Sequence, residues 1–333
     1  MNAPPPPAPP TRESWWRLGL ALLAFLLWAH PSLFGLPFAA LLLVPTGAKR
    51  PIWTDAVAGL VGAFSVGLVV LTAIDGVRLA ALTSTYIVLV TAAFVGLVLL
   101  KPAPILRQAL RAMLLGGLVT ALLIQIIWGP DAWGGLAWEA TRDAGLTMRA
   151  IVEVVPDTFT VYEPMVRFAS LTWPGMLALQ TLAGLALAWH LHFRLAAAWS
   201  GTPAMVAAPV PPPAPARFKD FRMGDGWVWG IVAWLGVLIL PVSNTLHMAG
   251  TNVGLVTSVL YVLRGAAIVV TFAEAFGVSA AALVLVAGLA AALAVPLLFV
   301  LPGLCTLGIT DTWYQYRRRL AAARGAGPTQ LKD

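Results

Sequence analysis

The stretch from 251 to 273, TNVGLVTSVLYVLRGAAIVVTFA, decides the fold class. A helix that crosses a membrane needs about 20 predominantly apolar residues, and this stretch is long enough and carries a single charge. That charge, Arg264, lies about midway, where insertion of a charged side chain costs at least ~2.5–3.5 kcal/mol. We therefore expect Arg264 to face the interior of a helix bundle or a water-filled cavity and to have a partner there.

The composition of the whole chain agrees with a membrane protein. Of its 333 residues, 59% are hydrophobic and 11% are charged, whereas a soluble domain carries about 25% charged residues. We predict an all-α, polytopic transmembrane helix bundle of roughly eight to ten membrane segments. The first segment is either one kinked helix or two short helices, because Pro31 interrupts it. The other expected spans are 54–73, 80–100, 108–128, 174–193, 226–241, 251–273 and 279–301, and the last of these is alternatively a broken hairpin within 279–310.

Charge in the connecting segments predicts the orientation. Cations gather beside apolar blocks and in the C-terminal tail, which is typical of cytoplasmic segments. We therefore expect the cell inner membrane, multi-pass, with both termini cytoplasmic. The expected divisions are a Pro-rich cytoplasmic tail at 1–14, an N-terminal bundle at 15–128, an extracytoplasmic amphipathic segment at 129–173, a C-terminal bundle at 174–310 with a Pro-rich linker at 200–225, and a basic tail at 311–333. Most tryptophans, Trp227 and Trp313 among them, fall near the ends of spans, as in an interfacial belt.

The segment 129–173 has a different character from its neighbours. It holds six acidic and three basic residues, a net charge of −3. Trp138, Leu146 and Ile151 alternate with charged residues in a pattern that favours an amphipathic helix on the membrane surface.

Two interpretations of Arg264 stay open. It could anchor an anionic group of a ligand, or it could form a structural pair with an acid or with free backbone carbonyls. Glu274 lies ten residues further on, about 15 Å along a helix, which is too far for direct pairing. Asp311 or a carbonyl at a broken helix is the better candidate.

Other polar side chains lie in or beside the same pair of spans. Tyr261, Asn252, Asn244 and His247 are candidates for a ligand pocket with Arg264, near the outer half of 226–241 and 251–273. Asn244 and Asn252 alternatively cap helix ends. Gln125 and Gln180 are lone amides in apolar spans, and we expect each to form an interhelical hydrogen bond.

Several functional classes are disfavoured. The chain has no phosphate-binding loop, no H-E-x-x-H pattern and no G-x-S-x-G elbow. We expect no enzyme activity, no catalytic residue and no cofactor. His190 and His192 point to different sides of a helix, so we expect no metal site. The net charge of +7 is spread over short loops, which argues against nucleic-acid binding.

The C-terminal third carries three motifs in a fixed order. Phe218 to Arg222 precede Trp227-Val228-Trp229, Asn252 opens a span that continues as Leu260-Tyr261-Val262-Leu263-Arg264-Gly265, and Leu307-Gly308-Ile309-Thr310-Asp311-Thr312-Trp313 runs into Tyr316-Arg317. This order resembles the YybS family of bacterial multi-pass membrane proteins, whose function is uncharacterised. The resemblance implies that Gly265, Asp311, Trp313 and Arg317 belong to a family motif. The family more often has an amide before the glycine, so a pocket role for Arg264 is not implied.

The front half of that family is in turn similar to the substrate-binding membrane subunits of energy-coupling-factor vitamin transporters. Their early helix docks on a coupling subunit through small residues spaced by four. Ala21 and Ala24 lack this spacing here, so the resemblance does not imply that interaction.

These observations favour two hypotheses. The first is a small-molecule-binding or transport-related membrane subunit. The second is a non-transporting membrane scaffold or assembly factor for envelope or division machinery, which holds protein partners through its basic and Pro-rich segments. A polar cavity at Arg264 favours the first, and a tight pair between Arg264 and Asp311 in a packed core favours the second.

Overall fold

The computed structural model describes residues 12–44, 53–74, 77–100, 103–154, 159–200, 218–293, 297–323 and 325, and all regular secondary structure within these ranges is helical. The predicted all-α fold is confirmed. Five of the helices are long and apolar enough to cross a membrane, which is compatible with an integral membrane protein. Most of the Pro-rich tail, most of the Pro-rich linker and the end of the basic tail lie outside the described residues.

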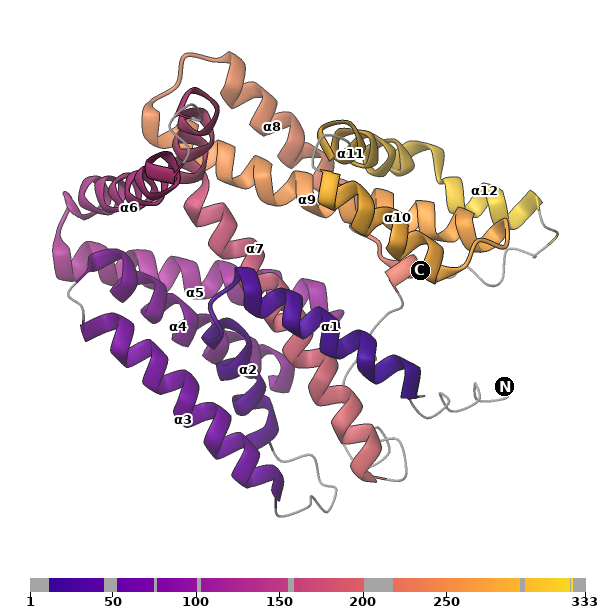
Figure 1. Ribbon diagram of the computed structural model, residues 1–333, viewed down its shortest axis with the longest axis horizontal. Helices are drawn as coiled ribbons and strands as arrows, with labels where there is room; N and C mark the ends of the chain where they lie inside the picture. The colour runs from indigo at the N-terminus through magenta and orange to yellow at the C-terminus, as the bar shows by residue number, and fades with distance from the viewer. Residues whose placement is uncertain are drawn as a thin grey trace. The chain divides into compact units, whose positions relative to one another are not determined.

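The chain forms two compact units, which divide at residues 215 and 216. Their helices are drawn in Figure 1. The N-terminal unit contains α1 (Arg12–Trp28), α2 (Ser32–Leu43), α3 (Trp53–Ile74), α4 (Arg78–Leu100), α5 (Ile105–Trp128), α6 (Ala132–Val154) and α7 (Phe159–Ser200). The C-terminal unit contains the short 3-10 helices η3 (Phe218–Asp220) and η4 (Asp225–Trp227), followed by α8 (Val228–Ile239), α9 (Asn244–Ala275), α10 (Ala280–Leu293), α11 (Leu297–Tyr314) and α12 (Tyr316–Ala323).

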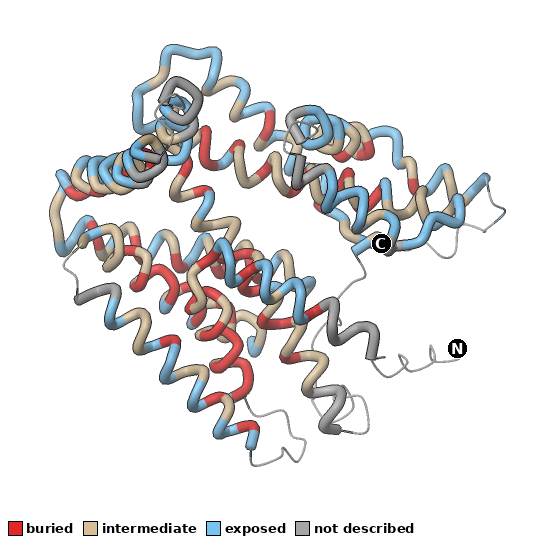
Figure 2. Tube along the Cα trace, viewed as in Figure 1, coloured by how far each residue is buried: buried red, intermediate tan, exposed pale blue. Residues whose placement is uncertain are grey.

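The core of the N-terminal unit lies where α2, α4, α5 and α7 meet, and buried residues are concentrated there in Figure 2. Glycine permits two of these helix contacts. A methyl group on Gly184 of α7 would meet the backbone carbonyl of Leu33, and one on Gly116 of α5 would meet the backbone of Val90. Small residues at such points let apolar helices approach closely, as in membrane bundles.

The break between α1 and α2 follows from Pro31, which has no backbone N–H to continue the first helix. α1 ends at Trp28 and α2 begins at Ser32, so the two-helix alternative is the one observed. The Nε2 atom of Gln180 on α7 donates to the exposed backbone carbonyl of Trp28 at 2.8 Å. The Oε1 atom of Gln125 accepts from Trp133 Nε1 at 3.2 Å. Both expected interhelical hydrogen bonds are confirmed.

The amphipathic segment is helical, but the boundary between it and the next span lies earlier in the chain than we expected. α6 buries Ala132, Leu136 and Ala140, while Trp138 and Leu146 remain exposed. α7 then begins at Phe159 and passes through Pro164 and Pro174 without interruption. Since α7 packs against α2, α5 and α6, the span expected at 174–193 belongs to the N-terminal unit and not to the C-terminal bundle.

In the C-terminal unit, α9 packs against both α8 and α11. α8 and α9 form an antiparallel pair in which Gly230 faces Thr257 and Gly250 faces Val237. The stretch 279–310 is divided into α10 and α11, and Pro302 lies inside α11 without ending it. Large apolar side chains on the outside of these helices are well exposed, among them Ile239 at 82%, Leu285 at 75% and Phe299 at 76%. Such surfaces suit a lipid environment.

Candidate functional site

The contact between α9 and α11 rests on two glycines. A methyl group added to Gly265 would meet the backbone carbonyl of Leu304, and one added to Gly308 would meet the backbone carbonyl of Tyr261. The pattern is reciprocal, since each glycine faces the carbonyl of the residue four positions before the other glycine. This close approach sets the register of the two helices and places Arg264 opposite Asp311.

Arg264 and Asp311 form a buried ion pair. The Arg264 Nε atom donates to Asp311 Oδ2 at 3.1 Å, and its Nη1 atom donates to Thr312 Oγ1 at 3.2 Å. Both residues are almost fully enclosed, with exposed fractions of 5% and 4%. Removing one partner of such a pair leaves a buried, uncompensated charge, which typically costs about 3–5 kcal/mol.

A second arginine shares the same carboxylate. Arg317 Nη2 lies 3.3 Å from Asp311 Oδ2, so one aspartate faces two guanidinium groups. Burial lowers the pKa of Arg317, as do the nearby positive charges of Arg222 and Arg264, whereas Asp311 raises it. An arginine stays protonated in spite of such shifts. The buried triad of Arg264, Asp311 and Arg317 therefore carries a net charge of +1.

The turn between α11 and α12 brings Arg317 back to Asp311. Gln315 adopts a left-handed backbone with φ 47°, and its N–H donates to the Asp311 carbonyl at 3.1 Å. The other carboxylate oxygen of Asp311 accepts from the backbone N–H of Tyr316 at 3.0 Å, at the first turn of α12. Asp311 therefore both pairs with the two arginines and fixes the chain direction that presents one of them.

Arg317 also holds the segment that precedes α8. Its Nη1 atom donates to the backbone carbonyls of Lys219 at 2.9 Å and Phe221 at 3.0 Å. The side chain of Lys219 in turn pairs with Glu274 near the end of α9 at 2.6 Å. These contacts place residues 222–225 beside the buried triad, where Asp225 Oδ1 lies 3.8 Å from Arg264 Nη1.

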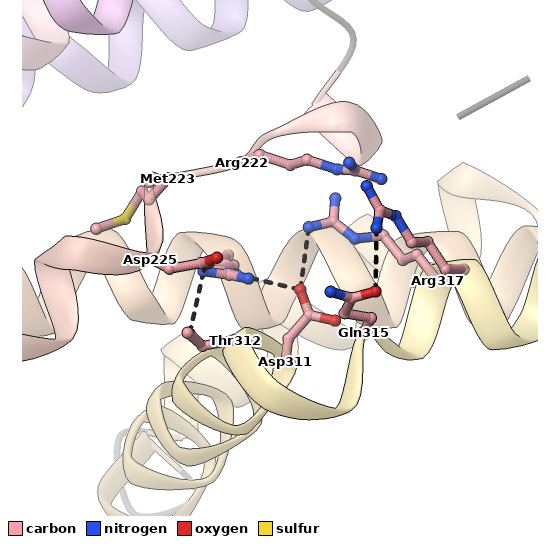
Figure 3. A pocket seen from close by; sticks show the side chains of 10 residues that line it. Arg222, Met223, Asp225, Asp311, Thr312, Gln315 and Arg317 are labelled. Carbon is pink, nitrogen blue, oxygen red and sulfur yellow. Dashed lines mark hydrogen bonds and ion pairs between the residues drawn. The ribbon is translucent and has the colours of Figure 1, made fainter. Parts of the chain in front are cut away.

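A polar cavity of about 170 Å³ opens between these elements. Four arginines and two aspartates line it, a net charge of +2. In Figure 3, Arg222 extends from the segment before η4 toward the side of the cavity on which Arg317 lies, while Asp311, Thr312 and Gln315 come from the end of α11 and the following turn. The lining residues are Arg222, Met223, Gly224, Asp225, Arg264, Asp311, Thr312, Gln315, Arg317 and Arg318.

Of the predicted pocket residues, only Arg264 lines this cavity. Tyr261 is completely buried one turn before Arg264 and does not line the cavity. Asn252 donates to the backbone carbonyl of Met248 within its own helix. It lies twelve residues before Arg264, about 18 Å along the helix.

Asn244 and His247 are further still from Arg264, at the start of α9. The N-cap of that helix is Ser243, whose side chain accepts from Leu246 N–H, so Asn244 is not the capping residue. The cavity at Arg264 therefore lies beside the basic segments, away from the start of α9 where Asn244 and His247 are placed.

The four residues of the C-terminal motif have separate roles. Gly265 makes the helix contact, Asp311 and Arg317 belong to the buried triad, and Trp313 is 63% exposed. The first part of the expected basic tail is therefore helical and packed against the rest of the unit. α11 continues to Tyr314 and α12 follows it, because Asp311 and Arg317 are held by Arg264 and by the 218–221 backbone.

Sequence reasoning missed Arg222, Asp225, Thr312, Gln315 and Arg318 as lining residues. Arg222 and Thr312 belong to the C-terminal motifs and Arg318 to a basic segment whose charge indicates orientation, whereas no sequence pattern pointed to Asp225 or Gln315. Comparisons of the chain with family models, with curated proteins and with solved structures found no match.

Proposed function

We propose that the protein is a multi-pass membrane protein whose C-terminal unit binds a small anionic ligand at the Arg264 cavity. The observation that supports this is the convergence of four arginines on one cavity that contains only two carboxylates. Two of the arginines, Arg264 and Arg317, are buried and fixed in position by Asp311. A site whose donors are already oriented loses little entropy when a ligand binds.

The cavity would open on the cytoplasmic side of the membrane. Lys219, Arg222 and the run Arg317 to Arg319 lie around it, and the positive-inside rule assigns such clusters to the cytoplasm. In this arrangement, the part of α9 from Asn244 to Leu263 crosses the hydrocarbon core. It contains 20 residues, or about 30 Å of helix, which matches the thickness of that core.

Arg264 would then lie at the boundary of the hydrocarbon core and not at its centre. This placement reduces the insertion cost that a charge at the bilayer centre would carry. It also gives a ligand access from the cytoplasm or from the headgroup region of the bilayer. In this proposal, the protein is a binding or transport-related subunit with no catalytic step of its own. It lies in the cell inner membrane with both termini in the cytoplasm.

A second candidate function is a membrane scaffold. It is favoured by the close pairing of Arg264 with Asp311, because a buried and satisfied ion pair needs no ligand. In this case the basic segments would hold a protein partner. The cavity beside the pair is the feature that the scaffold hypothesis leaves without a role.

Native mass spectrometry of gently extracted protein separates the two candidates. Arg318 lines the cavity, whereas the adjacent Arg319 lies over the ring of Tyr314 at 5.6 Å and does not line it. Both are exposed residues of α12, so Arg318→Gln and Arg319→Gln remove the same charge from neighbouring sites. We expect a small anion that is retained by the wild type and by Arg319→Gln and is lost from Arg318→Gln. A stoichiometric protein partner with no retained small molecule would instead support the scaffold.

A further inference from the structure

Resting on the proposed anion site, we infer that its ligand carries a terminal phosphate group as a dianion. The first argument is charge. The lining has a net charge of +2, and a phosphate monoester carries about −1.5 to −2 at neutral pH. A single carboxylate would leave about one positive charge uncompensated in a site where Arg264 and Arg317 are shielded from water.

The second argument is the direction of the donors. A planar carboxylate is matched by one guanidinium in a bidentate pair. Here the guanidinium groups come from three separate elements, Arg222 from the segment before η4, Arg264 from α9, and Arg317 and Arg318 from α12. Donors that converge from several directions suit a tetrahedral anion with oxygens on all sides.

The third argument is the size and chemistry of the cavity. A volume of about 170 Å³ is sufficient for several water molecules or for one phosphate group. The hydroxyl of Thr312 and the amide of Gln315 add neutral polar groups to the lining. The group attached to the phosphate would extend from the opening.

Exposed aromatic side chains close in sequence to the lining residues support a position of the cavity at the membrane interface. Phe218, Trp227, Trp229, Trp313 and Tyr314 are all exposed, and each lies within a few residues of a lining residue. Exposed tryptophan and tyrosine are typical of the membrane interface, the level at which lipid phosphates lie. A phosphate group could therefore come from the cytoplasm or from a lipid with a terminal phosphate, and the chemistry recognised is the same.

The test uses the full chain in phosphatidylcholine nanodiscs and measures the thermal unfolding midpoint, because a ligand that binds the folded state raises it. Inorganic phosphate and acetate are titrated at constant ionic strength, and a second set of nanodiscs contains phosphatidic acid. Wild type, Arg318→Gln and Arg319→Gln are compared. We expect phosphate or phosphatidic acid to stabilise the wild type and Arg319→Gln. Arg318→Gln should weaken the apparent affinity by about tenfold, because a hydrogen bond to a charged group is lost.

The outcomes identify the source of the phosphate group, and they test the phosphate inference separately from the anion site. Stabilisation by inorganic phosphate identifies a soluble ligand, and stabilisation by phosphatidic acid alone identifies a lipid headgroup. Equal stabilisation by acetate and phosphate would overturn the phosphate inference and leave the anion site intact. No stabilisation by any anion, or equal loss in Arg318→Gln and Arg319→Gln, would overturn the anion site itself.

Discussion

Gly265 of α9 and Gly308 of α11 lie opposite each other, so that a methyl group built on Gly308 would be 3.1 Å from the backbone nitrogen of Gly265. No side chain separates the two helices at this point. The ion pair between Arg264 and Asp311 lies next to this contact, and its short distances depend on it. The glycine contact is therefore the structural basis of the site.

Replacement of Gly265 by alanine should destabilise the C-terminal unit by about 1–3 kcal/mol or more, because the new methyl group meets the backbone of Leu304, which cannot move aside easily. The matched control is Gly303→Ala on α11, where nothing lies within 4 Å. Alanine there should be neutral or stabilising by up to about 1 kcal/mol, because glycine inside a helix is unfavourable. Unfolding of both variants in mild detergent by increasing denaturant measures the difference. Equal stability of the two variants would contradict the close contact.

Arg264 and Asp311 should show strong energetic coupling. We expect a double-mutant cycle with Arg264→Ala and Asp311→Ala to give an interaction energy of about 0.5–3 kcal/mol. Asp311→Ala alone should cost more than Arg264→Ala alone, because it leaves both Arg264 and Arg317 without their shared carboxylate. The same unfolding measurement provides all four stabilities.

The exposed pair of Arg149 and Glu153 serves as the control cycle. Its side chains are 77% and 65% exposed at a separation of 3.0 Å. An exposed pair spaced by four residues on a helix contributes about 0.3–0.5 kcal/mol. If the coupling of Arg264 with Asp311 were no larger than this, the buried triad would have no special role in the unit.

The long apolar helices were predictable because long apolar runs leave few alternatives. The need of Arg264 for a partner was predictable as well, since a charge in an apolar span must be compensated, and Asp311 was one of two candidates. α7 was placed only in part, because Pro164 and Pro174 normally interrupt helices but are tolerated inside this one.

The cavity itself could not be derived from the sequence pattern. The charge pattern of a short basic segment does not show which arginine is buried, so it did not separate Arg317 from Arg318. Only the family resemblance singled out Arg317. The difference between the two arginines is created by the turn at Gln315 and by the carbonyls of Lys219 and Phe221, which lie almost a hundred residues away in the chain. Asn252 was expected to line a pocket because it is polar and lies in an apolar span. Its side chain instead donates to a carbonyl of its own helix.

The stability of the C-terminal unit should depend on the shape of the side chain at position 315 and not on its polarity alone. A left-handed backbone is tolerated by asparagine and is costly for β-branched residues. We expect Gln315→Asn to retain stability and Gln315→Val to lose about 1–2 kcal/mol. Thermal unfolding of the two variants provides the comparison. Since the turn directs Arg317 back to Asp311, Gln315→Val should also weaken anion binding, whereas equal behaviour of the two variants would mean that the turn geometry is not a constraint.

The proposed orientation can be tested by chemical modification of single cysteines. Cys305 is the only native cysteine, so Cys305→Ala provides a background without thiols. We introduce Arg319→Cys at an exposed position of α12 and Asp143→Cys on α6, where the aspartate side chain is 46% exposed. If the basic segments are cytoplasmic, a membrane-impermeant thiol reagent should modify Arg319→Cys only in inside-out vesicles. If α6 is extracytoplasmic, the same reagent should modify Asp143→Cys only in intact spheroplasts. Permeabilised membranes, in which both positions should react, are the control for reactivity. Modification of both positions from the same face would contradict the proposed topology and would remove the argument that the Arg264 cavity opens toward the cytoplasm.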